Sequence, residues 1–415
     1  MFKVLISDPI SDLGIQQLHD ASEVIVEKKT GLSEDELVAI IPEYDALLVR
    51  SQTKVTKKIL DAGSKLKVVG RAGVGVDNID LNAATNHGIV VINAPDGNTI
   101  TTCEHTFAMM MALARHIPQA YAKTINGIWD RKTFLGVELN NKILGVIGLG
   151  RIGTEVAKRA RAFGMQIMGF DPFMSEERAE KLGIQLSSVD DIIRNADFIT
   201  VHTPLTNDTR HMISTAQFAV MKKGMRIVNC ARGGIIDEPA LVEAVNQGIV
   251  AGAAFDVFEQ EPPAADHPFL THPNIIVTPH LGASTIEAQE NVAIDVSEQV
   301  LHVLRDEPFT NAVNLPSVPA TVINKLQPYF KLGEELGHLV VQMTTGAVQE
   351  IILSYSGELV DVDTTPLTRY VVKGVLSHHL GSEQVNIVNS MHLAKTRGIN
   401  ITVQKSSAAK SFTNL

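Results

Sequence analysis

Residues 142–164 read KILGVIGLGRIGTEVAKRARAFG, in which an apolar run leads directly into three spaced glycines and then into a helix-forming segment. This is the strand–turn–helix context in which the pattern G-x-G-x-x-G binds the pyrophosphate of a dinucleotide. Gly148 permits the tight turn, Gly150 allows the backbone to approach the pyrophosphate, and Gly153 allows the helix to pack closely on the strand. The amide groups and the dipole at the start of the helix favour the bound anion.

Asp171 ends the next apolar run, QIMGFD, where the dinucleotide pattern places an acidic residue about 20 positions after the glycines. A carboxylate at this point hydrogen-bonds the ribose hydroxyls of NAD and repels the 2′-phosphate of NADP. No arginine follows immediately to reverse that preference. The alternative is a glycine-rich turn beside an exposed aspartate, but four coincident features favour an NAD site.

Apolar runs alternate with helix-like segments on both sides of this stretch, which predicts parallel, doubly wound sheets. We predict an α/β protein with two such domains and a small C-terminal α+β unit. The flavodoxin-like substrate-binding domain is discontinuous and comprises residues 1–97 and 283–315, and the Rossmann NAD-binding domain comprises residues 98–282. Ser33 and Glu36 form a capping box for one helix of the first domain.

The pattern changes from residue 316 onward. VINKLQPYFKLGEELGHLVVQM and TPLTRYVVKGVLSHHL have helical periodicity, with Asp363 as the cap of the second helix, and QEIILSYSG and INITVQ are typical of strands. These elements predict the C-terminal unit, residues 316–415, for which the sequence suggests no chemistry of its own.

The composition excludes several classes of protein. A net charge of −10 over 415 residues argues against a nucleic-acid partner or an anionic membrane surface, which would need a basic face. Two cysteines, Cys103 and Cys230, make a disulfide framework or a cysteine-based zinc site improbable. The N-terminus MFKVLISDPI lacks the features of a signal peptide, and we find no apolar run long enough to span a bilayer. We therefore expect a cytoplasmic protein.

Three side chains that can bind an anion or transfer a proton follow strands of the predicted NAD domain. Arg232 follows RIVNCA, Glu261 follows the strand that contains Asp256, and His280 follows NIIVTP. The carboxyl ends of neighbouring parallel strands meet at one sheet edge, so these side chains can converge near a nicotinamide ring. An arginine can hold a carboxylate in two hydrogen bonds, a histidine can move a proton, and a nearby carboxylate favours the imidazolium.

Less specific interpretations exist for each of these residues. Arg232 could belong to a surface ion pair, Glu261 could be an exposed loop acid, and a lone loop histidine is more often structural than catalytic. A metal site formed by His267, His272 and His280 is disfavoured, because their spacings fit no helical face and prolines lie among them. We expect no metal.

The segments VRSQTKVT, GRAGVGVDNID, GLGRIG, HTPLT, NCARGGIIDE, DVFEQEP and PHLGASTIEAQ resemble the D-2-hydroxyacid dehydrogenase family over roughly residues 1 to 312. GASTIEAQ, directly after the histidine of this set, is similar to the branch that acts on phosphoglycerate. The resemblance implies NAD-dependent oxidation of 3-phospho-D-glycerate to 3-phosphohydroxypyruvate, the first step of phosphorylated L-serine biosynthesis. It also implies that Arg232 binds the substrate carboxylate and that His280 exchanges the proton with Glu261 as its partner.

The resemblance implies further contacts. The cofactor-binding set is Val74, Gly148, Gly150, Arg151, Ile152, Gly153, Asp171, Thr203, Cys230, Ala231, Arg232, Asp256, His280, Leu281, Gly282 and Ala283. The substrate-binding set is Arg50, Ser51, Arg71 and Asn98, while Arg131 and Lys132 match a basic pair that reaches the neighbouring subunit in relatives. A homodimer or homotetramer is the implied assembly.

Two other functions remain open from the sequence. The substrate could be another D-2-hydroxy acid, such as lactate or glycerate, or the chain could be an NAD-sensing scaffold without catalysis. Residues 316–415 resemble part of the intervening domain of longer members of the family. Those members end in a serine-binding regulatory domain of the ACT type, and we expect none within residues 316–415, where no βαββαβ pattern is present.

Overall fold

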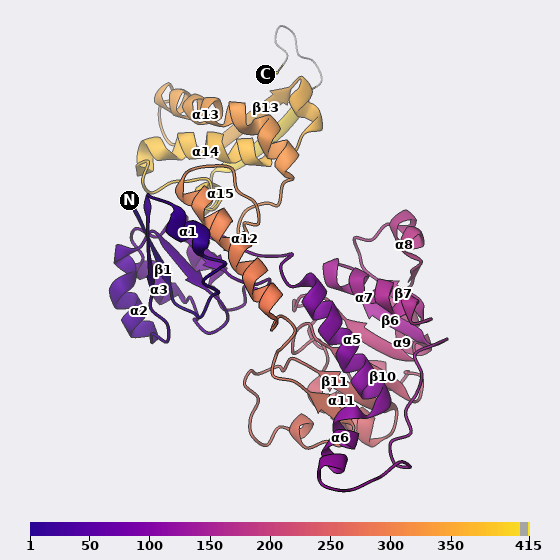
Figure 1. Cartoon of the computed structure of the whole chain (residues 1–415). Coiled ribbons are helices and arrows are strands. Elements are labelled where there is room, and N and C mark those ends of the chain that lie inside the picture. Colours follow the sequence, from indigo (N-terminus) through magenta and orange to yellow (C-terminus); the bar gives the residue numbers. More distant parts are fainter. Residues whose placement is uncertain (407–413) are drawn as a thin grey trace. The chain divides into compact units, whose positions relative to one another are not determined.

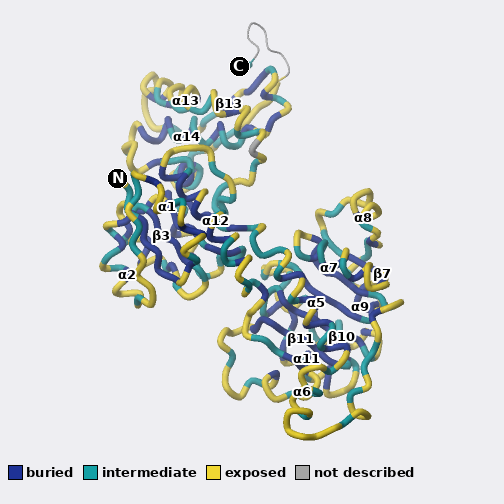
Figure 2. The backbone as a smooth tube through the Cα atoms, viewed as in Figure 1, coloured by how far each residue is buried: buried dark blue, intermediate teal, exposed yellow. Residues whose placement is uncertain are grey.

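Parallel strands form the two larger sheets of the computed structural model, which describes residues 1–406 and 414–415 (Figure 1). The chain divides into two units, one comprising Met1–Gly97 and Gln289–Leu415 and the other comprising Asn98–Ala288. The inner strands of both larger sheets are deeply buried, as Figure 2 shows. Strands buried on both faces are typical of parallel sheets that carry helices on each side.

The first unit contains a five-stranded parallel sheet with the order β2-β1-β3-β4-β5, which is the flavodoxin-like order. Its strands are β1 (Phe2–Ile6), β2 (Val24–Lys28), β3 (Ala46–Val49), β4 (Val68–Arg71) and β5 (Val90–Asn93). Its helices are α1 (Gln16–Asp20), α2 (Glu34–Ile40), η1 (Ile41–Glu43), α3 (Lys57–Ala62), α4 (Leu81–Asn86) and the long α12 (Ile286–Leu304), which packs on the sheet from Val292 onward. The capping box of Ser33 and Glu36 is confirmed at the start of α2.

The second unit contains a seven-stranded parallel sheet with the order β12-β11-β10-β9-β6-β7-β8. This is the Rossmann order with one further strand at its end. Its strands are β6 (Ile143–Ile147), β7 (Gln166–Phe170), β8 (Gln185–Leu186), β9 (Phe198–Val201), β10 (Met225–Asn229), β11 (Val250–Phe255) and β12 (Ile275–Val277). Its helices are α5 (Thr99–Arg115), α6 (Ile117–Ile125), α7 (Arg151–Ala162), α8 (Glu176–Leu182), α9 (Val189–Asn195), α10 (Thr215–Phe218), α11 (Glu238–Asn246) and η2 (Pro268–Leu270).

The C-terminal elements combine helices with a two-stranded parallel sheet of β13 (Glu350–Ser356) and β14 (Asn400–Ser406). The helices are α13 (Ala320–Gln342), η3 (Glu358–Asp361), α14 (Thr365–Leu380) and α15 (Ser390–Thr396). Val388 packs into the core of the five-stranded sheet, and Asn386 Nδ2 donates to the Gly88 carbonyl at 2.7 Å, so these elements join the first unit. Thr364 directly precedes α14, and Asp363 caps it one position earlier by accepting from the Thr365 amide at 3.0 Å.

Within residues 1–406 and 414–415, no helix combines the length and the apolar character that crossing a membrane requires.

Candidate active site

The glycine turn between β6 and α7 depends on the absence of side chains. Gly148 has φ +94°, and its amide donates to the Phe170 carbonyl at 2.8 Å, which ties the turn to β7. A Cβ on Gly153 would lie 1.9 Å from the Gly148 carbonyl oxygen. A larger residue at position 153 would therefore push α7 off the strand and displace the amides at its start.

Asp171 and Thr203 complete a binding surface around this turn. Asp171 accepts from the Leu149 amide at 2.9 Å through Oδ2 and from the Phe173 amide at 2.8 Å through Oδ1. Gly150 borders open space, and no side chain caps the start of α7. Thr203 Oγ1 is buried without a hydrogen-bond partner among the described residues. Amides for a pyrophosphate, a carboxylate for a ribose and an unsatisfied hydroxyl together fit a dinucleotide.

The turn that carries Arg232 follows β10 and is shaped by Asn229. Asn229 accepts from the Ala231 amide at 3.0 Å and donates to the Arg232 carbonyl at 2.9 Å. A Cβ on Gly233 would lie 1.9 Å from the Phe258 carbonyl oxygen, so only glycine allows this turn to touch the segment after β11. That segment leads to Glu261. The close approach therefore brings the arginine turn beside the glutamate loop.

Glu261 and His280 form a direct pair. His280 Nδ1 lies 2.7 Å from Glu261 Oε2, and Glu261 Oε1 accepts from the Phe258 amide at 3.1 Å. Burial alone would raise the pKa of Glu261, but the hydrogen bond and the charge of His280, with a further contribution from Arg232, lower it. The carboxylate is therefore ionised at neutral pH and can orient the imidazole. The two side chains are 38% and 47% exposed, so solutes can reach them.

Asp256 holds the loop on which His280 lies. Its side chain is fully buried, and it accepts from the Leu281 amide at 2.7 Å, the Gly282 amide at 2.8 Å and the Thr278 hydroxyl at 2.6 Å. Burial would raise the pKa of Asp256, whereas the hydrogen bonds from His105, Thr278 and the Leu281 amide lower it. Both carboxylate oxygens are thus engaged by protein donors. The predicted cofactor contact of Asp256 stays a prediction, and its role in the fold is to shape this loop.

Cys230 directly follows β10 and is buried. Burial and the negative charge of Asp256 raise the pKa of its thiol. The thiol is therefore protonated at neutral pH and is not poised as a nucleophile.

The other predicted cofactor residues of this unit occupy the same edge of the sheet. Arg151 and Ile152 begin α7, Ala231 follows β10, and Ala283 lies in the loop after β12. Their contacts with a cofactor stay predictions.

The predicted substrate residues lie mostly in the first unit. Arg50 and Ser51 follow β3 and Arg71 ends β4, so they share the carboxyl edge of the five-stranded sheet. Buried Asp8 fixes the loop after β3 by accepting from the Arg50 amide at 2.6 Å and from the Thr53 hydroxyl at 2.5 Å. The contribution of these residues to a common site with His280 stays a prediction.

Four further predicted positions lie elsewhere. The Val74 carbonyl, in the loop after β4, accepts from Asn93 at 2.5 Å. Asn98 directly precedes α5 in the second unit. Arg131 and Lys132 are exposed residues beyond α6.

The three histidines considered for a metal site have separate partners. His267 pairs with Glu238 at 3.0 Å, His272 lies 3.3 Å from Asn246, and His280 pairs with Glu261. Across the described ranges, no group of three side chains of the metal-binding types comes together.

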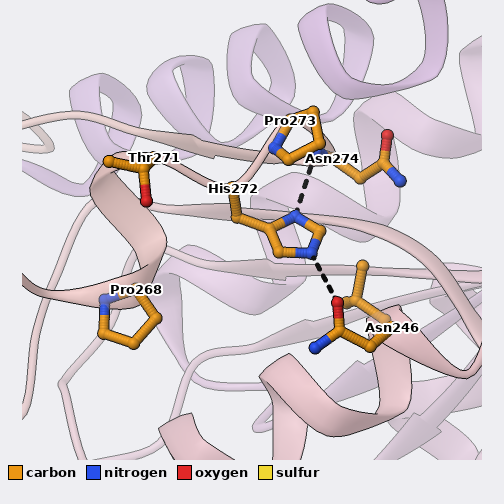
Figure 3. Close-up of a pocket in the computed structure, with 7 residues that line it drawn as sticks. Asn246, Pro268, Thr271, His272, Pro273 and Asn274 are labelled. Atoms are coloured by element: carbon orange, nitrogen blue, oxygen red, sulfur yellow. Dashed lines mark hydrogen bonds between the residues drawn. The ribbon is translucent and has the colours of Figure 1, made fainter.

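Figure 3 shows His272 in a pocket between the end of α11 and the residues before β12. There Nδ1 accepts from the Asn274 amide at 3.1 Å. This pocket lies at the amino end of β12, whereas His280 follows its carboxyl end. It is therefore remote from the proposed chemistry.

The sequence patterns did not identify several residues that support the His280 loop. Thr278 donates to Asp256, and Thr102 on α5 donates to the Gly282 carbonyl at 2.9 Å. His105, also on α5, lies 3.1 Å from Asp256. For Thr102 and His105 the one visible signal is a set of polar side chains in the otherwise apolar segment TTCEHTFAMMMALA.

Known protein families match two parts of the chain. The model described as "D-isomer specific 2-hydroxyacid dehydrogenase, NAD binding domain" matches residues 107–282. The model described as "D-3-phosphoglycerate dehydrogenase intervening domain" matches residues 325–415. The D-3-phosphoglycerate dehydrogenase of Bacillus subtilis (strain 168) is 48% identical over 415 residues, which are 100% of this chain and 78% of that protein. The chain belongs to the D-3-phosphoglycerate dehydrogenase family.

A second relative matches the whole chain, and a solved structure matches three quarters of it. The D-3-phosphoglycerate dehydrogenase of Methanocaldococcus jannaschii is 50% identical over 415 residues, covering 100% of this chain and 78% of that protein. Among solved structures, the TT0316 protein of Thermus thermophilus matches with a TM-score of 0.70 and 32% identity, over 75% of this chain and 99% of that one.

A D-lactate dehydrogenase of Aquifex aeolicus, solved with NAD and lactic acid, matches with a TM-score of 0.64 and 28% identity, over 74% of this chain and 96% of that one. The predicted α/β fold, the NAD cofactor and the oxidoreductase class are thereby confirmed.

Proposed function

We propose that the chain catalyses the NAD-dependent oxidation of 3-phospho-D-glycerate to 3-phosphohydroxypyruvate, the first step of phosphorylated L-serine biosynthesis. The observation that carries this proposal is the 2.7 Å pair of His280 and Glu261, at the same sheet edge as the glycine turn. The substrate is inferred from relatives named D-3-phosphoglycerate dehydrogenase that align with the entire chain.

His280 acts as the base in this proposal. NAD, when bound, accepts a hydride from the C2 carbon of the substrate. His280 Nε2 takes the proton of the C2 hydroxyl, and the electron pair of that O–H bond becomes part of the new carbonyl. Glu261, bonded to Nδ1, fixes the ring orientation and favours the imidazolium that forms.

Arg232 binds the substrate carboxylate in the same proposal. A guanidinium can donate two parallel hydrogen bonds to a carboxylate and hold it in a defined plane. The Arg232 turn touches the Phe258 segment that leads to Glu261, so the arginine lies beside the acid–base pair. Arg50, Ser51, Arg71 and Asn98 supply further contacts to the anionic substrate, which is consistent with a local positive charge in a chain of net charge −10.

The test is NADH formation by the purified chain with 3-phospho-D-glycerate, D-glycerate and D-lactate. We expect kcat/KM for the phosphorylated acid to exceed that for D-glycerate by about 100-fold or more, because Arg50 pairs with the phosphate. Arg50→Ala should abolish most of this preference. Lys54→Ala, an exposed cation in the same loop, is the control that should leave the preference unchanged.

Each other outcome has a defined meaning. Equal turnover of phosphorylated and plain glycerate would show that the substrate assignment is wrong. Preference for D-lactate would indicate that the substrate is another D-2-hydroxy acid. Binding of NADH without turnover of any acid would indicate a non-catalytic scaffold.

We also infer that the chain assembles as a homodimer or homotetramer in the cytoplasm. Ile117, Tyr121 and Ile125 recur at every fourth position of α6 and are 53%, 64% and 64% exposed. Trp129 and Leu135, in the segment that follows, are more exposed still, and Figure 2 shows this region as largely exposed. Exposed apolar side chains that recur along one face of a helix are typical of a protein interface.

A further inference from the structure

The first turns of α5 present polar side chains to the loop that carries His280. Thr101 and Thr102 lie three or four positions before His105, so all three occupy one side of the helix. Thr101 Oγ1 lies 3.2 Å from Thr285 Oγ1, and Thr102 Oγ1 donates to the Gly282 carbonyl at 2.9 Å. Figure 1 shows α5 running along the sheet that ends in this loop. The helix therefore holds the middle and the end of the loop.

His105 holds the beginning of the same loop through Asp256. His105 Nε2 lies 3.1 Å from Asp256 Oδ1 and 3.2 Å from Thr278 Oγ1. Asp256 Oδ1 also accepts from the Thr278 hydroxyl and the Leu281 amide, so three donors converge on one oxygen. The Thr278 hydroxyl donates its proton to Asp256. His105 Nε2 is therefore the donor both to Asp256 Oδ1 and to Thr278 Oγ1. The His105 side chain is 18% exposed and Asp256 is 0% exposed, which strengthens these bonds.

His280 has an unusual backbone that these contacts maintain. Its φ is +56°, in the left-handed region that residues other than glycine seldom occupy. Its amide donates to the Asp256 carbonyl at 2.9 Å, and the next amide, of Leu281, donates to Asp256 Oδ1 at 2.7 Å. A strained backbone of this kind persists only where the surroundings enforce it. Asp256 is therefore the anchor that sets the direction of the His280 side chain.

We propose that His105 is a positioning residue for His280. By donating to Asp256 Oδ1 it keeps that carboxylate aimed at the Leu281 and Gly282 amides, and so keeps the imidazole of His280 on Glu261. His105 itself touches no reacting atom in this scheme. The inference rests on the proposed function, because the loss of His105 would slow the proton transfer by His280.

Loss of the His105 donor acts on a buried charge. Asp256 would keep the two amides and Thr278, but one position at Oδ1 would be left without its donor in a site that water does not readily reach. The carboxylate can then shift toward its remaining donors and move the Leu281 amide with it. A displacement of about 1 Å at a catalytic group can cost about 100-fold in rate.

The experiment compares His105→Leu with His105→Gln in the full chain. Leucine fills a similar volume without a donor, whereas the glutamine amide can place an N–H near the position of Nε2. We expect His105→Leu to lower kcat about 10- to 100-fold with KM for NAD and for the acid changed less than about threefold. His105→Gln should recover most of kcat. The double variant His105→Leu/Thr278→Val should lose less kcat than the product of the two single-variant losses, because both donors bond the same oxygen of Asp256.

His87→Leu is the matched control. His87 Nε2 pairs with Asp61 Oδ1 at 2.7 Å, so it is also a histidine–aspartate pair, but it belongs to the first unit and the His280 loop to the second. Its kcat should equal that of the unmodified chain. The assay uses whichever D-2-hydroxy acid the unmodified chain oxidises best, so an error in the assigned substrate does not affect this comparison.

Two results would overturn the proposal. One is a kcat of His105→Leu within about twofold of the unmodified chain, when the concentration of folded sites is counted by NADH binding. The other is a kcat of His105→Gln as low as that of His105→Leu, which would indicate a packing role. If His105→Leu does not fold, Thr278→Val and His105→Gln decide the question, because Thr278→Val should lower kcat without a matching change in KM.

Discussion

At the scale of single residues, the proposed chemistry depends on the Glu261 carboxylate that is bonded to His280. Glu261→Gln keeps the size of the side chain but removes the charge that favours the imidazolium. We expect the midpoint of the pH–rate profile to move to lower pH and kcat to fall about 10- to 100-fold. Steady-state rates across a pH series measure both. Glu259→Gln, which alters an exposed acid of the same loop, should leave the midpoint in place. An unmoved midpoint in Glu261→Gln would show that this pair does not govern turnover.

Asp256 makes a residue-scale prediction about stability. Its pKa is lowered in the fold, because its hydrogen bonds outweigh the effect of burial. The unfolded chain has a value of about 3.9, so the ionised side chain contributes stability above that pH and loses the contribution as the pH falls through the lower folded value. We expect Asp256→Asn to reduce the free energy of unfolding by about 1–3 kcal/mol at neutral pH. Urea titrations should show this difference narrowing in acid. A difference in the free energy of unfolding that stayed constant with pH would mean that the charge of Asp256 contributes nothing to stability.

At the scale of elements, the turn between β6 and α7 depends on Gly153. A Cβ there would lie 1.9 Å from the Gly148 carbonyl oxygen, so even alanine forces the helix away from the strand. We expect Gly153→Ala to destabilise the chain by about 1–3 kcal/mol and to weaken NADH binding, because the amides at the start of α7 move. Thermal unfolding and NADH titration measure the two effects. Lys158→Ala, on the exposed side of α7, should change neither, and normal NADH affinity in Gly153→Ala would refute the argument.

The elements also differ in how visible they are in the sequence. The apolar runs KILGVIG and AAFDVF predicted buried strands, and the structure has β6 (Ile143–Ile147) and β11 (Val250–Phe255) there. β11 begins and ends three residues earlier than predicted, so Asp256 lies just after the strand and not within it. β8 contains only two residues, Gln185–Leu186, which is too short for a period to be recognised. The loop after β12 has no periodicity at all, and its shape comes from Asp256 and α5, which are distant in the sequence.

At the scale of the whole molecule, the exposed apolar surface of α6 and the segment after it predicts self-association. Ile125→Glu together with Trp129→Glu places charges in this surface, which should convert the inferred oligomer to monomers. Sedimentation velocity measures the change. Leu13→Glu is the control, because Leu13 is an exposed apolar residue elsewhere on the chain and should not affect assembly. An unchanged sedimentation coefficient in the double variant would place the interface elsewhere.

The sequence by itself determined the doubly wound fold, the glycine turn with Asp171 and the family. These features are encoded by residues that are adjacent in the sequence, because a strand, a turn and a helix follow one another without interruption. It also predicted Arg232, Glu261 and His280 as a set, because parallel strands bring their carboxyl ends to one edge. The tertiary structure alone decided that His280 bonds Glu261 through Nδ1 and that Asp256, His105 and Thr102 hold its loop. Such contacts join residues 19 to 180 positions apart, and no local pattern encodes a distance between two side chains that only packing brings together.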